Sequence, residues 1–303
     1  MSNRASRPMA EPAIQSAVLR ALGASEGRWR RVGPTGWGEA WVLTSGQERH
    51  FVKLASGSHA GMLDCEAEGL RALRGTDALR VPDVRALGVA ESVAFLVLEW
   101  LDLQPLTDAA ALGRALARLH ASTPPRGNDR ERFGWNRDNW IGGSAQANAW
   151  TDDWATFFRD MRLRPQFERA FGNGFLDLVP DAERLLVEVP RLLAGHAPAP
   201  SLVHGDLWSG NAGALPSGEP VVFDPAVYVG DAEVDVAMTE LFGGFGRQFH
   251  VAYNALRPAR PGYATRREIY NLYHLLNHLN LFGATYLERT WRSVRKLLLA
   301  EAR

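Results

Sequence analysis

Residues 202–224, with the sequence LVHGDLWSGNAGALPSGEPVVFD, decide how the rest of the chain is interpreted. A short apolar stretch leads to His204-Gly205-Asp206, and two further apolar runs flank a turn rich in glycine and proline at 216–220. Such punctuation predicts a β-hairpin. In a hairpin, the residue that enters the first strand lies opposite the residue that leaves the second, with Cβ atoms about 5 Å apart. We therefore expect Asn211 and Asp224 to meet at the open end of the hairpin, close to Asp206.

These three side chains have complementary chemistry. Asn211 and Asp224 offer the oxygen ligands that Mg²⁺ takes together with phosphate oxygens, and Asp206 stands apart as an acceptor for the proton of an attacking hydroxyl. Protein kinases use a catalytic Asp, an Asn five residues later and a later metal-binding Asp in this order, and the same spacing separates Asp206 from Asn211. A hairpin end that is merely capped by Asp and Asn is the alternative. The order of the residues favours phosphoryl transfer.

The N-terminal part of the chain contains a matching set of residues. Gly33, Gly36 and Gly38 lie between strand-like flanks and would let backbone amides approach phosphates. Taken alone, such glycines more commonly form a hairpin turn without a ligand, but the strand that follows at 51–54 favours the phosphate-binding interpretation. Lys53 lies within an apolar strand, where an unpaired charge is costly. The helical pattern at 62–73 places Glu66 on its inward face. A strand Lys paired with a helix Glu is the kinase device for holding the α- and β-phosphates; the alternative is that Lys53 reaches solvent from an edge strand.

Three motifs narrow the interpretation: HGDLWSGN at 204–211, VVFDPAVYVGDAEVDVAMTELFGGF at 221–245 and NLYHLLNHLNLFG at 271–283. Together they resemble the fructosamine kinase (ketosamine-3-kinase) family, whose relatives include aminoglycoside and choline kinases. The resemblance extends from about Val32 to Leu297. It implies an α+β, bilobal, protein-kinase-like fold, with a small β-rich lobe at 1–101 and a larger, mainly helical lobe at 102–303.

The resemblance also implies an activity. Members use ATP and Mg²⁺ to phosphorylate the O3 hydroxyl of ketosamines, such as fructosamine or ribulosamine adducts of lysine, and the product falls apart to release the amine. Lys53 and Glu66 match the pair that grips the nucleotide, and the backbone of Glu99 and Leu101 would meet adenine. The acceptors are ketosamine small molecules or glycated proteins.

The acceptor side is predicted from weaker patterns. The loop at 132–142 and its continuation to Trp150 resemble the family pattern, and we assign Asn139 and Gln146 to the sugar pocket, although aromatic and amide side chains also suit ordinary loop packing. Trp208 either walls the acceptor pocket or packs beneath its loop. Asp235 is expected to brace the loop that holds Asp206, ahead of a helix at 236–242.

Composition limits the other possibilities. Lys plus Arg and Asp plus Glu number 34 each, so no broad basic field indicates nucleic acid or an anionic membrane. The single cysteine, Cys65, and the lack of a signal-like or membrane-length apolar run predict a cytoplasmic protein without a disulfide. Two alternatives stay open: a kinase of another small acceptor (aminoglycoside, choline or homoserine), and a non-catalytic nucleotide-binding scaffold. The sequence does not decide the oligomeric state or the physiological ketosamine.

Overall fold

The computed structural model describes residues 10–35, 37–124 and 132–300. Contacts divide the chain into two compact units. The first comprises the residues up to Gly75 together with Val81–Leu103, and the second comprises Thr76–Arg80 and the chain from Gln104 onward. The first unit contains a five-stranded antiparallel sheet and the second is mainly helical, which confirms the predicted α+β class.

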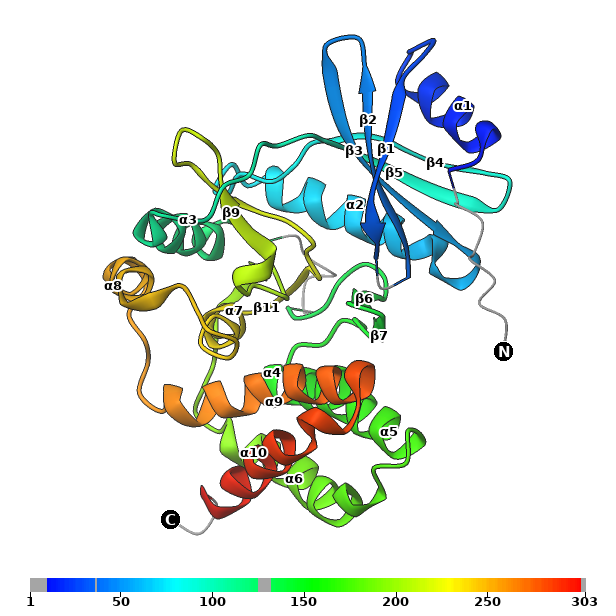
Figure 1. Ribbon diagram of the computed structural model, residues 1–303. Helices are drawn as coiled ribbons and strands as arrows, with labels where there is room; N and C mark the ends of the chain where they lie inside the picture. The colour runs from blue at the N-terminus through cyan, green and yellow to red at the C-terminus, as the bar shows by residue number, and fades with distance from the viewer. Residues whose placement is uncertain (1–9, 36, 125–131, 301–303) are drawn as a thin grey trace. The chain divides into compact units, whose positions relative to one another are not determined.

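The sheet of the first unit has the strand order β1-β2-β3-β5-β4 (Figure 1). Its strands are β1 (Arg28–Pro34), β2 (Gly38–Ser45), β3 (Glu48–Ser56), β4 (Val84–Ala90) and β5 (Val93–Glu99). The central strand β5 carries an uninterrupted apolar run because both of its faces are covered, whereas Lys53 interrupts the apolar run of β3.

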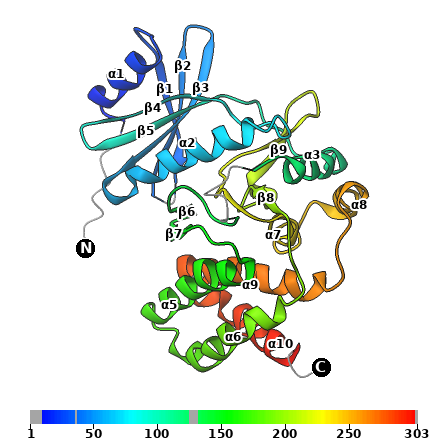
Figure 2. The ribbon, with the colours of Figure 1, turned by 180° about the vertical axis from the view of Figure 1, so that it is seen from behind.

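Two helices cover opposite faces of this sheet, α1 (Pro12–Ala21) and α2 (Ala60–Arg74), as Figures 1 and 2 show. Val52 and Leu54 join a core cluster that includes Ile14 and Val18 of α1. Side chains alternate along a strand, so Lys53 points to the other face, where its Nζ lies 2.7 Å from the Glu66 carboxylate on α2. The period of β3 therefore places Lys53 beside its predicted partner.

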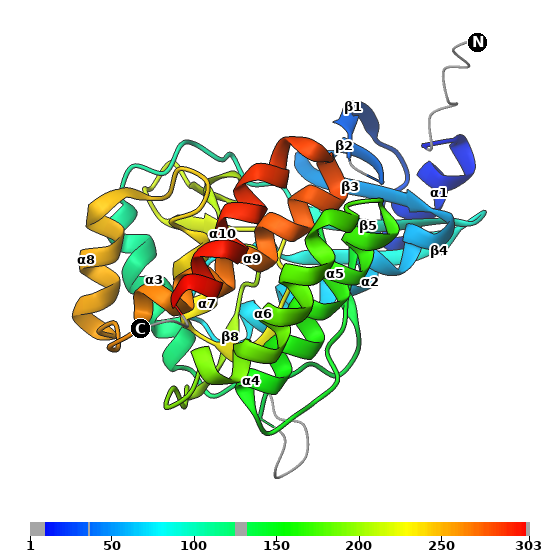
Figure 3. The ribbon, with the colours of Figure 1, turned by 90° about the horizontal axis from the view of Figure 1, so that it is seen from below.

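Helices make up most of the second unit. They are α3 (Ala109–Ala121), α4 (Trp154–Phe157), a π-helical turn (Phe158–Leu163), α5 (Arg164–Gly172), α6 (Val179–Leu192), α7 (Glu233–Met238), α8 (Gly246–Leu256), α9 (Tyr263–Phe282) and α10 (Leu287–Ala300). Figure 3 shows α9 and α10 side by side, with α5 and α6 packed against them. No helix among the described residues is long and apolar enough to cross a membrane.

Three small antiparallel pairs lie within the second unit: β6 (Asn139–Ile141) with β7 (Ser144–Gln146), β9 (Ala212–Ala214) with β10 (Pro220–Val222), and β8 (Pro200–Val203) with β11 (Tyr228–Asp231). The β9–β10 pair is the hairpin predicted from the sequence. The β8–β11 pair brings together the chain just before Asp206 and the chain just after Asp224.

The predicted helix at 236–242 is wrong in its bounds. Glu233 and Asp235, expected to precede the helix, lie within α7. The helix begins earlier because Asp231 Oδ1 accepts a hydrogen bond from the backbone nitrogen of Glu233, which satisfies one of the unpaired donors at the helix start.

Candidate active site

Gly205 determines the path of the loop that carries Asp206. Its φ of +82° lies in the left-handed region, and a Cβ added there would lie 2.1 Å from the carbonyl oxygen of Ala226. The neighbouring His204 carbonyl accepts a hydrogen bond from the nitrogen of Ala226 at 2.8 Å. The two loops therefore approach each other at a distance that only glycine permits.

Asp235 braces this loop from α7, as predicted. Its two carboxylate oxygens accept the backbone N–H groups of His204 at 2.7 Å and of Gly205 at 2.8 Å. His120 places its Nε2 3.1 Å from the same carboxylate and its Nδ1 2.9 Å from the Tyr253 hydroxyl. These hydrogen bonds lower the pKa of Asp235 despite its complete burial. The loop is thus held by the buried carboxylate of Asp235.

Asn211 and Asp206 are in direct contact. The Asn211 amide nitrogen donates to the Asp206 carbonyl oxygen at 2.9 Å and to its Oδ2 at 3.2 Å. Since the amide nitrogen faces Asp206, the amide oxygen of Asn211 is directed to other partners.

The backbone nitrogen of Phe223 donates a hydrogen bond to the Asn211 carbonyl at 3.1 Å. Asp224 is the next residue and lies at the open end of the hairpin. Its φ is +55°, an uncommon value for a residue with a side chain. Asp224 is exposed, whereas Asn211 is 7% exposed. The expected proximity of Asp224 to Asp206 is reflected in the pKa of Asp206, which burial and then the Asp224 carboxylate raise to about 7.

The first unit holds the predicted nucleotide residues. Both side chains of the Lys53–Glu66 ion pair are mostly buried, at 12% and 13% exposure. Gly33 lies in β1 and Gly38 opens β2; a Cβ on Gly38 would lie 1.9 Å from the Leu54 carbonyl oxygen, whereas Gly33 has open space. Gly36 lies outside the described residues.

The predicted adenine segment follows β5. The Glu99 carboxylate accepts a hydrogen bond from the Asp83 nitrogen at 3.1 Å, and the Leu101 carbonyl accepts one from Leu103 at 2.9 Å. Between them the indole of Trp100 packs under the guanidinium of Arg49, 5.1 Å from the ring centroid. Trp100 is therefore engaged in packing within its own unit.

Comparison with known proteins decides the family. A model of the fructosamine kinase family matches residues 16–300. The chain belongs to the fructosamine kinase family. A "Probable ketoamine kinase" of Synechocystis sp. is 42% identical to it over 265 residues, which cover 86% of each chain. A chloroplastic "Protein-ribulosamine 3-kinase" of Oryza sativa subsp. japonica is 38% identical over 241 residues, or 78% of this chain and 68% of the rice protein.

Solved structures agree with this assignment. A "putative fructosamine-3-kinase" of Haemophilus somnus superposes with a TM-score of 0.84 at 28% identity, covering 94% of this chain and 97% of the other. The aminoglycoside phosphotransferase APH(4)-Ia superposes with a TM-score of 0.57 at 16% identity, covering 93% and 98%. The second likeness shows the shared protein-kinase-like fold and no more.

In this fructosamine kinase family member, Asn139 and Gln146 are buried, at 4% and 2% exposure. The Asn139 amide donates to the Val227 carbonyl at 2.7 Å, and the Gln146 amide donates to Asn139 at 2.8 Å and to the Ala226 carbonyl at 3.2 Å. Both side chains thus hold the chain just after Asp224. The prediction that they contact an acceptor sugar stays untested, and their hydrogen bonds are made inside the protein.

Sequence reasoning missed two members of this network. Asn148 donates to Asn139 at 2.8 Å, and Arg162 on the π-helical turn donates to Asn148 at 2.7 Å. Arg162 is fully buried, with its guanidinium 3.9 Å from the ring centroid of Tyr228. The available signal was the spacing of Arg162 from Phe158, four residues earlier, which places both on one face of a helix.

Trp208, two residues after Asp206, is 37% exposed. Its ring covers Gly210, where an added Cβ would lie 2.4 Å from the indole, and it meets Phe242 edge-on at 6.5 Å. Phe242 in turn packs on His278 at 4.4 Å. An exposed indole next to the catalytic loop fits the prediction that it walls the acceptor pocket, which remains untested.

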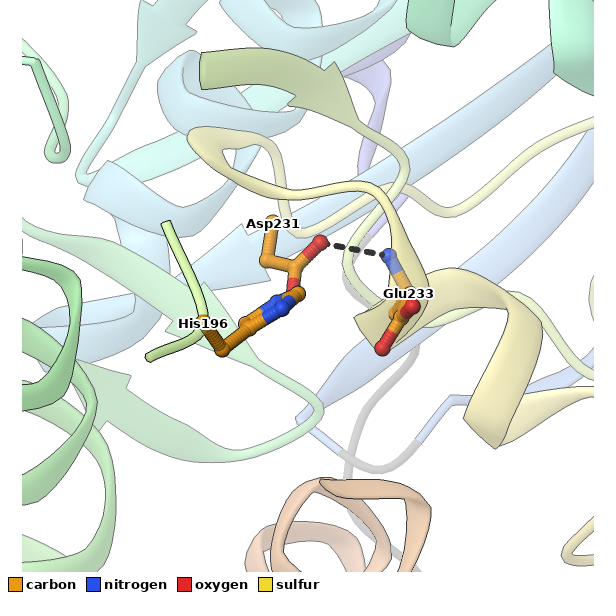
Figure 4. Close-up of side chains that lie close together, drawn as sticks. All are labelled: His196, Asp231 and Glu233. Carbon is orange, nitrogen blue, oxygen red and sulfur yellow. Dashed lines mark hydrogen bonds and ion pairs between the residues drawn. The ribbon is translucent and has the colours of Figure 1, made fainter. Parts of the chain in front are cut away.

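Among the described residues, one group could hold a metal ion elsewhere: His196, Asp231 and Glu233, shown in Figure 4. His196 Nε2 lies 2.6 Å from Asp231, which also accepts from the Tyr270 hydroxyl at 2.7 Å. Arg266 donates to both oxygens of Glu233, at 2.6 and 2.9 Å. Because each group has a protein partner of opposite charge or a hydrogen bond, we interpret this cluster as an ion-pair network that ties α7 to α9.

Proposed function

We propose that this protein is an ATP-dependent kinase that phosphorylates the O3 hydroxyl of ketosamines, and that this reaction leads to deglycation. One observation carries the proposal: a chain of the fructosamine kinase family presents Asp206 in contact with Asn211 on a loop braced by Asp235. Ketosamine small molecules are the first acceptors to consider, and glycated proteins are a further possibility under the same proposal.

Asp206 is the proposed catalytic base. Its carboxylate is half-buried. Burial and the nearby Asp224 carboxylate raise the pKa of Asp206 to about 7, which suits a group that must accept a proton near neutral pH. The hydrogen bond from the Asn211 amide fixes its direction. In phosphoryl transfer most of the catalysis is positioning and charge stabilisation, so a rigidly held base is what the reaction needs.

Asn211 and Asp224 fit a Mg²⁺ ion. Both offer oxygen donors, the amide nitrogen of Asn211 is already occupied by Asp206, and Asp224 is exposed at the open end of the hairpin. Hard oxygen ligands are what Mg²⁺ selects. When bound, the ion would supply positive charge against the phosphate oxygens of ATP.

Nucleotide binding is assigned to the first unit. Lys53 would contact the α- and β-phosphates, held in position by Glu66. Backbone amides around Gly33, Gly36 and Gly38 would contact phosphate oxygens, and the backbone of Glu99 and Leu101 would bind adenine. Trp208 would offer its exposed face to the acceptor, while Asn139 and Gln146 act as positioning residues through the carbonyls of Ala226 and Val227.

A kinase of another small acceptor would share the same catalytic residues. The likeness to aminoglycoside phosphotransferases extends to the fold alone. Relatives that are 36–42% identical and cover most of the chain are named as probable ketoamine kinases or as a protein-ribulosamine 3-kinase. The hypothesis of a non-catalytic scaffold does not explain why a buried carboxylate, that of Asp235, holds the Asp206 loop in place. Both alternatives are therefore less well supported than ketosamine phosphorylation.

The product identifies the reaction. With MgATP and a ribulosyl- or fructosyl-lysine derivative, ³¹P NMR should show a sugar phosphate ester at O3 that decays as free lysine derivative appears in the mass spectrum. Asp224→Ala should abolish the ester signal. The variant should remain folded, as measured by circular dichroism in the absence of ATP. Phosphate on another hydroxyl, or on the amine, would contradict the assignment of O3.

A further inference from the structure

A polar groove lies in the second unit between the turn at Glu240-Leu241 and the helices α9 and α10, which run side by side in Figure 3. Its volume is about 370 Å³. Neither the predicted catalytic residues nor the predicted nucleotide residues line it. A hollow of this size holds a small molecule, and the charge and hydrogen-bonding groups of its wall determine which kind.

The wall carries more positive than negative charge. Its two carboxylates are neutralised by neighbours, Glu240 by Arg267 and Glu268 by Lys296. Arg289 and Arg292 are then left in excess. Among the described residues, no carboxylate lies within ion-pair distance of Arg289, and the partner of Arg292 is Glu288, in a pair whose side chains are 72% and 75% exposed. An exposed pair of this kind contributes little, so the groove favours an anion.

Asn271 of α9 adds a second, independent indication. It lines the groove, is only 8% exposed, and its Oδ1 is buried without a hydrogen-bond partner in the described part of the chain. Leaving a buried polar atom unpaired costs about 1–3 kcal/mol. The amide can rotate to present either its oxygen or its nitrogen, so a bound molecule that offers a donor or an acceptor would complete its hydrogen bonding.

We propose that this groove is a binding site for a phosphate group, supplied either as inorganic phosphate or as the monoester of a small sugar. Guanidinium groups pair with phosphate through two parallel hydrogen bonds, and Arg289 and Arg292 lie one α-helical turn apart on the same helix. The Asn271 amide donates a further hydrogen bond. The neutralised carboxylates Glu240 and Glu268 would accept from sugar hydroxyls.

Arg289 also connects the groove to the catalytic loop. It donates to the Leu241 carbonyl at 3.3 Å, and its guanidinium lies 5.4 Å from the centroid of Phe242, whose ring contacts Trp208. A phosphate that draws Arg289 into the groove weakens its contact with Phe242. We expect bound phosphate to change the KM for the acceptor, a consequence that rests on the proposed kinase function.

Binding is tested directly and without turnover. Inorganic phosphate and glucose 6-phosphate are titrated calorimetrically into the full-length protein, with glucose as the neutral comparison. We expect saturable binding of a phosphate compound and none of glucose. Asn271→Asp places a negative charge in the wall and Arg289→Gln removes the main donor; each should weaken binding about tenfold or more, the scale of a hydrogen bond to a charged group.

Two further variants complete the design. Arg292→Gln changes an exposed side chain and keeps the test valid if Asn271→Asp does not fold; it should weaken binding in the same direction. Arg295→Gln is the matched control, because Arg295 belongs to the same helix but packs on Trp291 and faces Asp181; its affinity should equal that of the wild type.

The outcomes are distinct. If glucose 6-phosphate binds more tightly than inorganic phosphate, the groove is a site for a phosphate monoester. If the two bind with equal affinity, the phosphate group alone accounts for binding. Both results support the proposal. Absence of saturable binding at millimolar concentrations overturns it, as does binding that the groove variants leave unchanged, because the phosphate would then occupy another part of the protein. Neither result depends on whether the protein is a ketosamine kinase.

Discussion

At the scale of single residues, Asp206 combines three features that a catalytic base requires. It follows a glycine in the left-handed region, its backbone neighbours are held by the Asp235 carboxylate, and its own carboxylate accepts from Asn211. Each hydrogen bond restricts one degree of freedom of the loop. The carboxylate is thereby kept in a defined direction before any substrate binds, which is the condition for efficient general-base catalysis.

Asp206→Asn tests this role. The substitution keeps the size and the contact with Asn211 but removes the proton acceptor, so kcat should fall on the order of 10²-fold or more, with little change in the KM for ATP. A coupled ADP-release assay measures both constants. Asp152→Asn, at an exposed position outside the site, is the control and should retain full activity; equal activities of the two variants would rule out Asp206 as the base.

The sequence predicted which residues pair locally, but it did not predict the buried hydrogen-bond networks around them. The Lys53–Glu66 pair and the grouping of Asp206 with Asn211 follow from strand alternation, helix periodicity and hairpin pairing, all of which are local. The buried network of Asn139, Gln146 and Arg162 joins residues that are far apart in the sequence: 88 positions separate Asn139 from Val227 and 127 separate Gln146 from Tyr273. No local period encodes such a contact, so those amides resembled a binding loop.

At the scale of elements, the hairpin β9–β10 and the strand pair β8–β11 place the proposed catalytic residues Asp206, Asn211 and Asp224. The first pair positions Asn211 next to Phe223, and the second holds the Asp206 loop against the chain after Asp224. Beyond the β8–β11 pair, Gly205 packs against the carbonyl of Ala226. The geometry of the site therefore depends on one residue without a side chain.

Gly205→Ala should disrupt both stability and activity. The new methyl group would enter the space of the Ala226 carbonyl oxygen, 2.1 Å away, at a φ of +82°, and we expect a loss of about 3 kcal/mol or more in the free energy of unfolding. Urea denaturation measures it.

Gly218→Ala is the matched control for this change. Gly218 has a similar φ of +86° but open space around its Cα, so only the backbone cost of about 1–2 kcal/mol should appear. Equal losses in the two variants would show that the contact with Ala226 is unimportant.

Element boundaries were less predictable than element types. Helix α3 begins at Ala109, because the Asp108 side chain accepts a hydrogen bond from the nitrogen of Ala111 at 2.8 Å and caps the helix. The helix expected from Val236 begins three residues earlier, where Asp231 receives the Glu233 nitrogen. Near α7 three acidic residues, Asp231, Glu233 and Asp235, could cap the helix, and the folded chain uses Asp231.

At the scale of the whole molecule, buried histidines couple stability to pH. Burial lowers the pKa of His274 from 6.5 to about 3, so the folded state holds this side chain neutral while the unfolded chain binds a proton below pH 6.5. The stability that depends on a neutral His274 is fully present above pH 6.5 and is lost progressively as the pH falls from 6.5 towards 3. Burial lowers the pKa of His204 in the same direction.

His274→Leu should therefore flatten the pH dependence of stability. Below pH 6.5 the wild type should lose about 1.4 kcal/mol per pH unit more than the variant, measured as the free energy of unfolding in urea between pH 7.5 and 5. Above pH 6.5 the two curves should run parallel. Parallel curves over the whole range would mean that His274 is not held neutral in the folded protein.

The fold of the whole molecule was predicted through motifs and not through periodicity. The long run from Val221 to Phe245 and the late helix at 271–283 resemble one family closely enough to imply the arrangement of sheet and helices, which the structure confirms. The division into two compact units was not predictable in the same way. Thr76–Arg80 joins the mainly helical unit through the bridge between Arg80 and Val221, and a single bridge leaves no periodic pattern in the sequence.

The central claim is that the Asp206 site phosphorylates ketosamines. The most direct measurement is Mg²⁺-dependent ATP consumption by the purified protein with a fructosyl- or ribulosyl-lysine derivative, compared with choline, homoserine and an aminoglycoside. We predict turnover on the ketosamine and not on the other acceptors. Turnover on one of the others with none on the ketosamine would contradict the claim, and ATP binding without turnover on any of them would favour a scaffold.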